Sequence, residues 1–581
     1  MVTASHVAAA TTTTLVHRAD QAPGWWRDAV IYQIYPRSFA DSDGDGVGDL
    51  PGITGRLDHL ARLGVDAVWL SPFYPSPQHD GGYDVADYRS VHPQLGTLSD
   101  MDALIARADQ LGLRVIVDLV PNHTSDAHPW FAEALAAPPG SPERGRYIFR
   151  DGTGPDGAEP PNNWGSVFGG PGWTRITEAD GSPGQWYLHL FDSHQPDLNW
   201  EHEEVRGEFI DVLRFWLDRG VAGFRVDVAH GLIKDQSFPE WEGHRAMISA
   251  EESAEHAGKR APMWDQPRVH EIYRTWREVL AEYGPERVLI AEAWVEDDRA
   301  LARYVRPDEM HQAFNFQFLT TPWRAGALRQ SIQTSLLELD SVGAPCTWVL
   351  SNHDVVRAAS RLGLSVTGKG PNGIGAGDPQ PDGELGLRRA RAGLLLMLAL
   401  PGSAYLYQGE EFGLPEHTDL PDEVRQDPTF ARTDGRVVGR DGCRIPLPWR
   451  SDAPGYGFSP TGATWLPQPE SFAALAADMQ KGDPSSTYEL VRAALRIRRD
   501  WRLGSGSLAW VDGLPVNEGD LLVFTNREVV VLVNLGERAV PLPTDLEVLL
   551  ASGGGDDVDH VGPDEAVWAV IPRPADDDGP H

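Results

Sequence analysis

Short apolar segments alternate with amphipathic stretches along most of the chain. The eight apolar segments cover residues 29–35, 67–70, 114–120, 223–228, 288–291, 313–318, 347–350 and 403–407. The stretches between them have helical periodicity, as where apolar residues recur at three- and four-residue spacing at Val205, Phe209, Val212, Leu213 and Trp216. This alternation predicts an α/β fold, a (β/α)8 TIM barrel of parallel strands. The alternative is an open doubly wound sheet, but no G-x-G-x-x-G sequence follows a strand.

Two departures from this alternation predict additional domains. Residues 122–200 are rich in Pro, Gly and Trp and are too long for a simple connection, so we expect an inserted subdomain after the third strand. Residues 504–573 contain strand-like segments joined by Gly, Asn and Asp, which predicts a C-terminal antiparallel β domain. The barrel itself is assigned to 24–121 and 201–503, with a disordered tail at 1–23 and an acidic tail at 574–581.

Composition excludes several classes of partner. The 581 residues include 50 Lys and Arg against 85 Asp and Glu, a net charge of −35, which disfavours binding to nucleic acids and to anionic membranes. The longest apolar run, 392–400, is too short to span a bilayer. With only two cysteines, Cys346 and Cys443, and no signal-peptide pattern, the sequence predicts a cytoplasmic protein.

Polar residues gather where four of the predicted strands end. They are Asp118 and His123 at the third strand, Arg225, Asp227 and His230 at the fourth, Glu292 at the fifth, and His353 and Asp354 at the seventh. Any one of these acids could be a buried core residue that is paired with a cation. However, charged residues are rarely buried, and packing alone does not explain why four strands carry polar residues at the same end. Because β/α barrels carry their active sites at this end, we expect one pocket with three carboxylates, Asp227, Glu292 and Asp354.

Three crowded carboxylates suit the cleavage of a glycosidic bond. Retaining glycosidases use two carboxyl groups about 5–5.5 Å apart, one as nucleophile and one as acid and then base. Crowding raises the pKa of at least one carboxyl group, so that an acid and an anion coexist near neutral pH. Arg225 lies two residues before Asp227, on the same face of its strand, and is placed to keep Asp227 ionised.

The segments that carry these residues resemble a known family. Asp118–His123 (DLVPNH), Gly223–His230 (GFRVDVAH), Ile290–Trp294 (IAEAW) and Ser351–Asp354 (SNHD) resemble the four signatures of the α-amylase superfamily, glycoside hydrolase family 13. Gln195–Asn199 (QPDLN) resembles a fifth signature of its oligo-1,6-glucosidase and α-glucosidase branch. The resemblance covers about residues 25–571. It implies a retaining, exo-acting α-glucosidase that releases terminal non-reducing glucose from short oligosaccharides or α-glucosides, with transglucosylation as an accompanying activity.

The resemblance assigns a role to each matching residue. Asp227 becomes the nucleophile, Glu292 the general acid/base, and Asp354 the third carboxylate, which binds substrate hydroxyls. The residues implied to bind or line the sugar site are Asp80, Tyr83, Asp118, His123, Phe191, Gln195, Arg225, His353 and Arg444. An Asp80–Arg444 ion pair is expected to close the pocket, although Gly442 and Cys443 depart from the family pattern there. The alternatives are core aromatics for Tyr83 and Phe191 and a surface ion pair for Arg444.

An acidic loop follows the first predicted strand. Its sequence, DSDGDGVGD over residues 41–49, resembles the first half of a calcium loop, but Gly52 occupies the position where an EF-hand requires Glu. The family resemblance implies a structural Ca²⁺ or Mg²⁺ site, with ligands from Asp41, Asp43, Asp45, Asp49 and the carbonyl of Val47. The alternative is a solvated acidic turn. No organic cofactor is predicted.

Three functions remain open at this level. The first is the α-glucosidase. The second is a glucosyltransferase, trehalose synthase or sucrose isomerase of the same family, which excludes water from the acceptor subsite that the 231–266 loop is expected to line. The third is a non-enzymatic transporter subunit, which the three acids and the missing membrane helix disfavour. In the oligo-1,6-glucosidase branch that the chain resembles, Val after the nucleophile goes with α-1,6 cleavage and Thr with α-1,4, so the resemblance implies that Val228 favours α-1,6 or mixed linkages. The expected partner is a small sugar substrate, and the protein is expected to be a monomer or homodimer.

Overall fold

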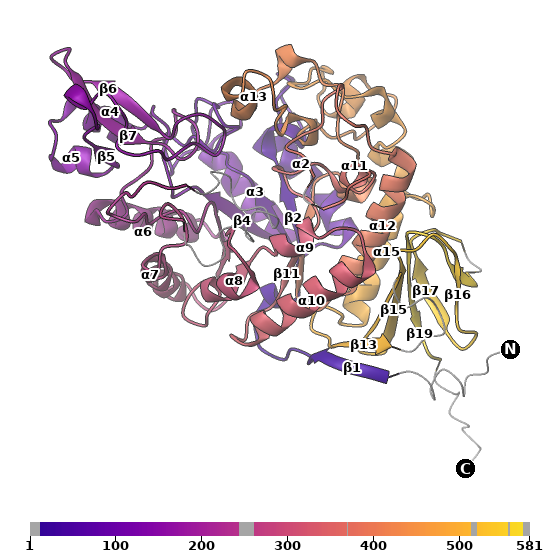
Figure 1. Ribbon diagram of the computed structural model, residues 1–581. Coiled ribbons are helices and arrows are strands. Elements are labelled where there is room, and N and C mark those ends of the chain that lie inside the picture. Colours follow the sequence, from indigo (N-terminus) through magenta and orange to yellow (C-terminus); the bar gives the residue numbers. More distant parts are fainter. Residues whose placement is uncertain (1–11, 243–260, 369, 513–519, 556–557, 573–581) are drawn as a thin grey trace.

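The central element is a barrel of eight parallel strands (Figure 1). The computed structural model describes residues 12–242, 261–368, 370–512, 520–555 and 558–572, so the predicted acidic tail at 574–581 lies outside the described residues. Around the barrel the strands are β10 (Gln312–Ala313), β9 (Val288–Ala291), β8 (Gly223–Val226), β4 (Arg114–Leu119), β3 (Ala67–Leu70), β2 (Val30–Ile34), β12 (Ser403–Tyr407) and β11 (Thr347–Val349). Each hydrogen-bonded pair of strands is parallel. The barrel closes between β10 and β11, where Asn315 N, just after β10, donates to Thr347 O in β11 at 2.9 Å.

The strands are apolar because both of their faces are covered. Side chains fill the barrel on one side, and helices pack on the other, so nearly every strand residue is buried. One predicted strand, 313–318, is wrong beyond its first residue: β10 ends at Ala313, and helix α9 (Phe316–Thr320) follows. The physical reason is a cap, because the Asn315 side chain accepts a hydrogen bond from Phe318 N at 2.9 Å and starts the helix.

The outer layer consists of amphipathic helices. The main ones are α2 (Leu50–Leu63), α3 (Leu98–Gln110), α6 (Glu203–Asp218), α7 (Val269–Ala281), α8 (Asp298–Tyr304), α10 (Ala325–Asp340), α12 (Gly383–Ala399) and α15 (Thr487–Asp500), with short α11 (Ala358–Arg361), α13 (Pro428–Arg432) and α14 (Ala477–Gln480). In α6 the predicted apolar stripe is buried against the barrel. None of the helices in the described ranges combines the length and apolar character needed to cross a bilayer.

The segment between β4 and β8 projects from the barrel (Figure 1). It contains α4 (Pro129–Ala136), α5 (Pro142–Gly145) and a small antiparallel sheet of β5 (Phe149–Arg150), β7 (Pro183–Leu188) and β6 (Trp173–Thr177). A buried lysine ties it to the barrel: Lys234 Nζ contacts Asp197 Oδ2 at 2.8 Å and donates to Asn122 Oδ1 at 2.8 Å. The Lys234 and Asp197 side chains are both 0% exposed, so this charge pair is sealed from water.

The C-terminal part forms an antiparallel sheet beside the barrel. Its order is β1 (Thr12–His17), β13 (Leu508–Asp512), β14 (Leu521–Asn526), β15 (Val529–Asn534), β19 (Glu565–Val570) and β17 (Glu547–Ala551), next to a two-stranded pair, β16 (Val540–Pro541) and β18 (His560–Val561). The predicted disordered tail over 1–23 is therefore wrong at residues 12–17, while 1–11 lie outside the described residues. Strand β1 forms because the edge of β13 offers unpaired backbone groups to a Thr-rich segment.

Candidate active site

One pocket opens where β4, β8, β9 and β11 end. It has a volume of about 410 Å³. Its lining residues are Asp80, Tyr83, His123, Val167, Phe168, Phe191, Asp227, Val228, Glu292, Trp294, His353, Asp354, Val355, Gly370, Pro371, Asn372, Thr429 and Arg440. The three carboxylates that are far apart in the sequence, Asp227, Glu292 and Asp354, all line it.

A single guanidinium holds three carboxylates at the base of this pocket. Arg225, which is 2% exposed, contacts Asp118 Oδ1 at 2.8 Å and Asp227 Oδ1 at 2.6 Å through Nη1, and Glu292 Oε2 at 2.8 Å through Nη2. Because Asp227 and Glu292 bond to the same planar group, they lie close together, as retaining glycosidases require. Asp118 is fully buried and supports Arg225 from below without lining the pocket.

The backbone after β8 orients Glu292. Val228 has a φ of 45°, a left-handed conformation that a β-branched residue rarely adopts. Its N–H donates to Glu292 Oε2 at 2.9 Å, and Trp294 Nε1 donates to Glu292 Oε1 at 3.2 Å. Both oxygens of Glu292 are thus held by fixed donors, and the strained turn is found at the site where it directs a hydrogen bond.

Burial disfavours the charged form of two of the carboxylates around Arg225. It raises the pKa of Asp227, the carboxylates of Glu292 and Asp118 raise it further, and Arg225 opposes both effects. Burial likewise raises the pKa of Asp118 to about 7 against the opposing charge of Arg225. Both shifts have the same cause, because a buried carboxylate loses its water and is repelled by its acidic neighbours.

Asp354 lies in the opposite electrostatic environment. Its Oδ1 accepts from Arg440 Nη1 at 2.9 Å and from Arg444 Nη2 at 3.1 Å, and its Oδ2 lies 3.3 Å from His353 Nε2. Burial opposes ionisation, but His353 and the two arginines together hold the pKa of Asp354 well below its usual value. Asp354 is therefore a permanent anion in the wall of the pocket.

The expected ion pair between Asp80 and Arg444 is wrong, because the arginine that pairs with Asp80 is Arg440. Asp80 Oδ1 contacts Arg440 Nη2 at 2.7 Å, and Arg440 also binds Asp427 and lines the pocket. Arg444 lies behind that wall, where its Nε donates to the carbonyl of His353 at 2.9 Å. Both arginines belong to the segment RDGCR over residues 440–444, one on each side of the short turn Asp441–Cys443. The spacing of the sequence alone does not tell which of the two enters the pocket.

The remaining predicted residues surround the same space. Tyr83 stacks on His353 with ring centroids 5.2 Å apart, and its hydroxyl donates to Asp118 Oδ2 at 3.0 Å. Phe191 packs against His123 at 5.2 Å, and burial lowers the pKa of His123 to about 4, so this ring is neutral at pH 7. Gln195 is buried outside the lining and donates to Asp80 Oδ2 at 3.1 Å. It supports the pocket wall.

The acidic loop brings three of its four aspartates together. One oxygen each from Asp41, Asp43 and Asp49 lies within 4.8 Å of the others. Asp45 is outside this cluster, contrary to the expected ligand set, because its carboxylate accepts from Gln94 Nε2 at 2.8 Å and from Val47 N at 2.8 Å. Asp49 also caps helix α2, accepting from Gly52 N at 2.6 Å. An oxygen-only donor set of this kind fits a hard cation such as Ca²⁺ or Mg²⁺.

Comparisons with known proteins agree with this fold. The family model described as "Alpha amylase, catalytic domain" matches residues 33–503. A probable α-glucosidase of Rhizobium meliloti (strain 1021) is 39% identical over 534 residues, which cover 89% of this chain and 90% of the relative. An oligo-1,6-glucosidase of Parageobacillus thermoglucosidasius is 34% identical over 548 residues, covering 88% and 91%. Among solved structures, the α-glucosyl transfer enzyme XgtA has a TM-score of 0.79 and 35% identity, with 95% of this chain and all of that chain covered.

A parallel barrel with acidic side chains gathered at the carboxyl ends of its strands is an architecture that glycoside hydrolases use. The extent of the family match and the identity to these relatives show that the chain belongs to the α-amylase family, glycoside hydrolase family 13.

Proposed function

We propose that the protein is a retaining, exo-acting α-glucosidase that releases terminal glucose from short α-linked oligosaccharides or α-glucosides. The observation that carries the proposal is the contact of Asp227 and Glu292 with one guanidinium inside a small pocket. Glucosidase relatives at 34–39% identity support it. A pocket of about 410 Å³, rather than an open cleft, suits one chain end.

The proposed reaction proceeds through two displacements. An Asp227 oxygen attacks the anomeric carbon while Glu292 gives its proton to the leaving oxygen, so the glycosidic bond breaks and a glucosyl ester forms. Glu292, now a carboxylate, takes a proton from water, and the resulting hydroxide displaces Asp227 from the anomeric carbon. Glucose leaves with its original anomeric configuration, and both carboxyl groups return to their starting protonation states.

The other side chains position the sugar. Asp354 is an anion held by Arg440 and Arg444, and it accepts hydrogen bonds from sugar hydroxyls. His123 and His353 line the same pocket, and their ring nitrogens are already held by neighbouring protein groups, so these rings fix the shape of the site around the sugar. The stacked pair of Tyr83 and His353 provides a flat apolar surface for the sugar ring.

A second candidate is glucosyl transfer, in which a sugar replaces water in the second step. The structural neighbours support it, since they include the α-glucosyl transfer enzyme XgtA and a trehalulose synthase with 30% identity and a TM-score of 0.77. The loop expected to line the acceptor site runs over 231–266, of which 243–260 lie outside the described residues. Val228 lines the pocket, and we propose that it favours α-1,6 or mixed linkages.

A substrate panel tests the proposed function. Maltose, isomaltose, nigerose, kojibiose, sucrose and trehalose are incubated separately, and free glucose is scored against new disaccharides. Glucose as the main product from at least one α-linked disaccharide supports the hydrolase. New disaccharides with little free glucose identify a transferase or isomerase. If no sugar in the panel reacts, the proposed function is rejected.

Arg440 is expected to determine how tightly the terminal sugar binds. Arg440→Met removes the ion pairs with Asp80, Asp354 and Asp427, which hold this wall of the pocket in place, so we expect KM to rise roughly tenfold or more, since a hydrogen bond to a charged group contributes about 1.5–3 kcal/mol. Arg388→Met, an exposed arginine on α12, is the matched control and should leave KM unchanged. Initial rates over a range of substrate concentrations measure both. An unaltered KM in Arg440→Met would contradict this role.

We also propose that the acidic loop binds a structural Ca²⁺ or Mg²⁺ ion. Asp41, Asp43 and Asp49 would supply carboxylate oxygens, and the Val47 carbonyl is the remaining expected ligand. The ion would neutralise three neighbouring negative charges and fix the loop against helix α2, which Asp49 caps. Since the loop is separate from the pocket, the role is stability rather than chemistry.

Removing divalent cations is expected to lower thermal stability. Treatment with a chelator leaves the three aspartates repelling one another, so the melting temperature should fall and return when Ca²⁺ or Mg²⁺ is added. Differential scanning calorimetry with and without the chelator measures the shift. Asp43→Asn should make the melting temperature insensitive to the chelator. Identical melting curves under all conditions would show that the loop is only an acidic turn.

We further propose a cytoplasmic enzyme that works as a monomer or homodimer. Both cysteines are free and buried, which suits a reducing compartment. The acidic surface disfavours nucleic acids and anionic membranes as partners. Size-exclusion chromatography with light scattering measures the oligomeric state directly, and a stable trimer or larger assembly would contradict the proposal.

A further inference from the structure

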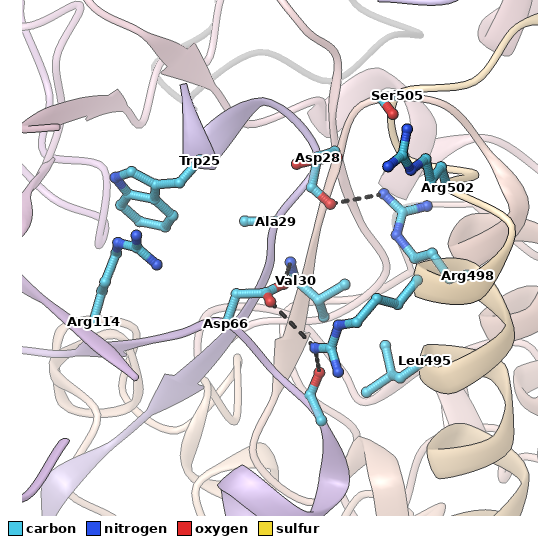
Figure 2. A pocket seen from close by; sticks show the side chains of 13 residues that line it. Trp25, Asp28, Ala29, Val30, Asp66, Arg114, Leu495, Arg498, Arg502 and Ser505 are labelled. Carbon is cyan, nitrogen blue, oxygen red and sulfur yellow. Dashed lines mark hydrogen bonds and ion pairs between the residues drawn. The ribbon is translucent and has the colours of Figure 1, made fainter. Parts of the chain in front are cut away.

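A second cavity lies at the other end of the barrel, where the strands begin. Its volume is about 480 Å³, and its walls include Val30, the first residue of β2, and Arg114, the first residue of β4. Figure 2 shows Trp25 and Arg114 on one side of this cavity and Arg498 and Arg502 on the other. It shares no lining residue with the catalytic pocket.

The lining of this cavity is unusually basic for so acidic a chain. Four arginines face only two aspartates, Asp28 and Asp66, whereas the whole protein has a net charge of −35. Two positive charges are therefore in excess in a concave site, and such a site attracts small anions.

Two of the four arginines are engaged with the protein. Arg499 Nη2 contacts Asp66 Oδ1 at 3.2 Å and donates to Gly64 O at 2.8 Å. Arg498, only 4% exposed, donates from Nη1 to the carbonyls of Leu398 and Leu400 at 2.7 and 2.8 Å. Arg498 forms no ion pair within the described ranges, and its Nε has no acceptor there. Its buried charge is thus balanced by carbonyl dipoles and by the nearby carboxylates of Asp28 and Asp66.

The other two arginines supply the excess charge. In the part of the chain that the structure describes, neither Arg114 nor Arg502 forms an ion pair. The Arg114 guanidinium lies over the Trp25 ring, 4.6 Å from its centroid, which holds the cation in place without neutralising it. Arg502 is exposed just beyond the end of α15, near Ser505, which also lines the cavity. Within the described ranges, both guanidinium groups are therefore cations without an acidic partner.

We propose that this cavity binds a phosphate group, either as free phosphate or as the monoester of a small metabolite, with Arg114 and Arg502 as its charged partners. A phosphate monoester carries about −1.5 to −2 charge at pH 7, which matches the two unbalanced cations. Guanidinium groups suit phosphate because their planar donors pair with two oxygens at once. The volume of about 480 Å³ accommodates a phosphorylated monosaccharide as well as the bare anion.

Calorimetric titration at constant ionic strength tests the proposal. Inorganic phosphate and glucose 6-phosphate are titrated separately into the full-length protein, with excess glucose present to occupy the catalytic pocket. We expect saturable binding with one site per chain. Arg114→Gln and Arg502→Gln should each weaken it roughly tenfold or more, because each removes a charge-assisted hydrogen bond. Arg388→Gln, on an exposed part of α12, should bind like the unmodified protein.

The outcomes separate the sources of the phosphate and can reject the site. Binding of both probes shows that free phosphate suffices, and binding of glucose 6-phosphate alone shows that the ligand is an ester. Turnover of an α-glucoside should be unchanged in both variants, since the cavity is remote from Asp227. Heats that do not saturate, or equal affinity in all three variants, would overturn the proposal without bearing on the glucosidase activity.

Discussion

Asp227→Ala is expected to lower turnover by roughly four to six orders of magnitude, in line with the loss of a nucleophile in other covalent enzymes. Without the carboxylate no glucosyl ester forms, and the remaining groups only bind the sugar. Stability should not fall, because burial and neighbouring carboxylates already disfavour the Asp227 anion in the folded protein. Single-turnover kinetics and a melting curve on the same preparation measure the two effects.

Glu292→Gln separates the two chemical roles. This variant cannot protonate a leaving group, so natural disaccharides should react as slowly as with Asp227→Ala. A substrate with a good leaving group, such as a nitrophenyl glucoside, needs no proton and should still form the ester. Asp211→Ala, an exposed residue on α6, is the matched control. Full activity in either pocket variant, or a trapped sugar on a residue other than Asp227, would reject the assigned roles.

Lys234→Met is expected to destabilise the folded protein by about 3–5 kcal/mol, the range for a buried charge left without its partner. The substitution preserves the aliphatic part of the side chain but leaves Asp197, which is 0% exposed, without its cation. Asp197 is fixed within the inserted segment, where its Oδ1 accepts from Leu190 N at 2.9 Å, and its contact with Lys234 joins that segment to the chain after β8. We expect urea unfolding to begin at clearly lower denaturant in this variant.

A surface pair provides the comparison for Lys234. Arg268 contacts Glu201 at 2.6 Å, but its side chain is 52% exposed, so Arg268→Met should cost at most about 1 kcal/mol. The two variants remove one cation each and differ in burial. If both unfold at the same urea concentration, the buried lysine contributes no more than an ordinary surface ion pair, and its proposed role in joining the insertion to the barrel is wrong.

Much of the fold could be predicted because its signals are local. A strand buried on both faces is apolar throughout, so segments such as 114–120 and 403–407 are visible without a structure. The pairing of β1 with β13 was not predictable in this way, because its two strands are nearly 500 residues apart and their contact depends on how the barrel places them.

The site shows the same division between local and long-range information. The carboxylates at strand ends were predictable, since a barrel brings the ends of its strands together. The choice between Arg440 and Arg444 was not, because it depends on the turn between them and on the position of Asp80 far away in the chain. Nor does the sequence reveal the positive φ of Val228, a conformation that its side chain disfavours and that the surrounding contacts impose.

The shared contact of Arg225 has a consequence for the charge balance of the proposed reaction. If Asp227 becomes an ester, its negative charge disappears, and of the three carboxylates that contact Arg225 only Asp118 and Glu292 remain charged partners. The guanidinium is then shared by two groups instead of three, which strengthens its hold on each of them. Cleavage of the ester would restore the third contact, so the number of anions that one arginine balances would change with the covalent state of the enzyme.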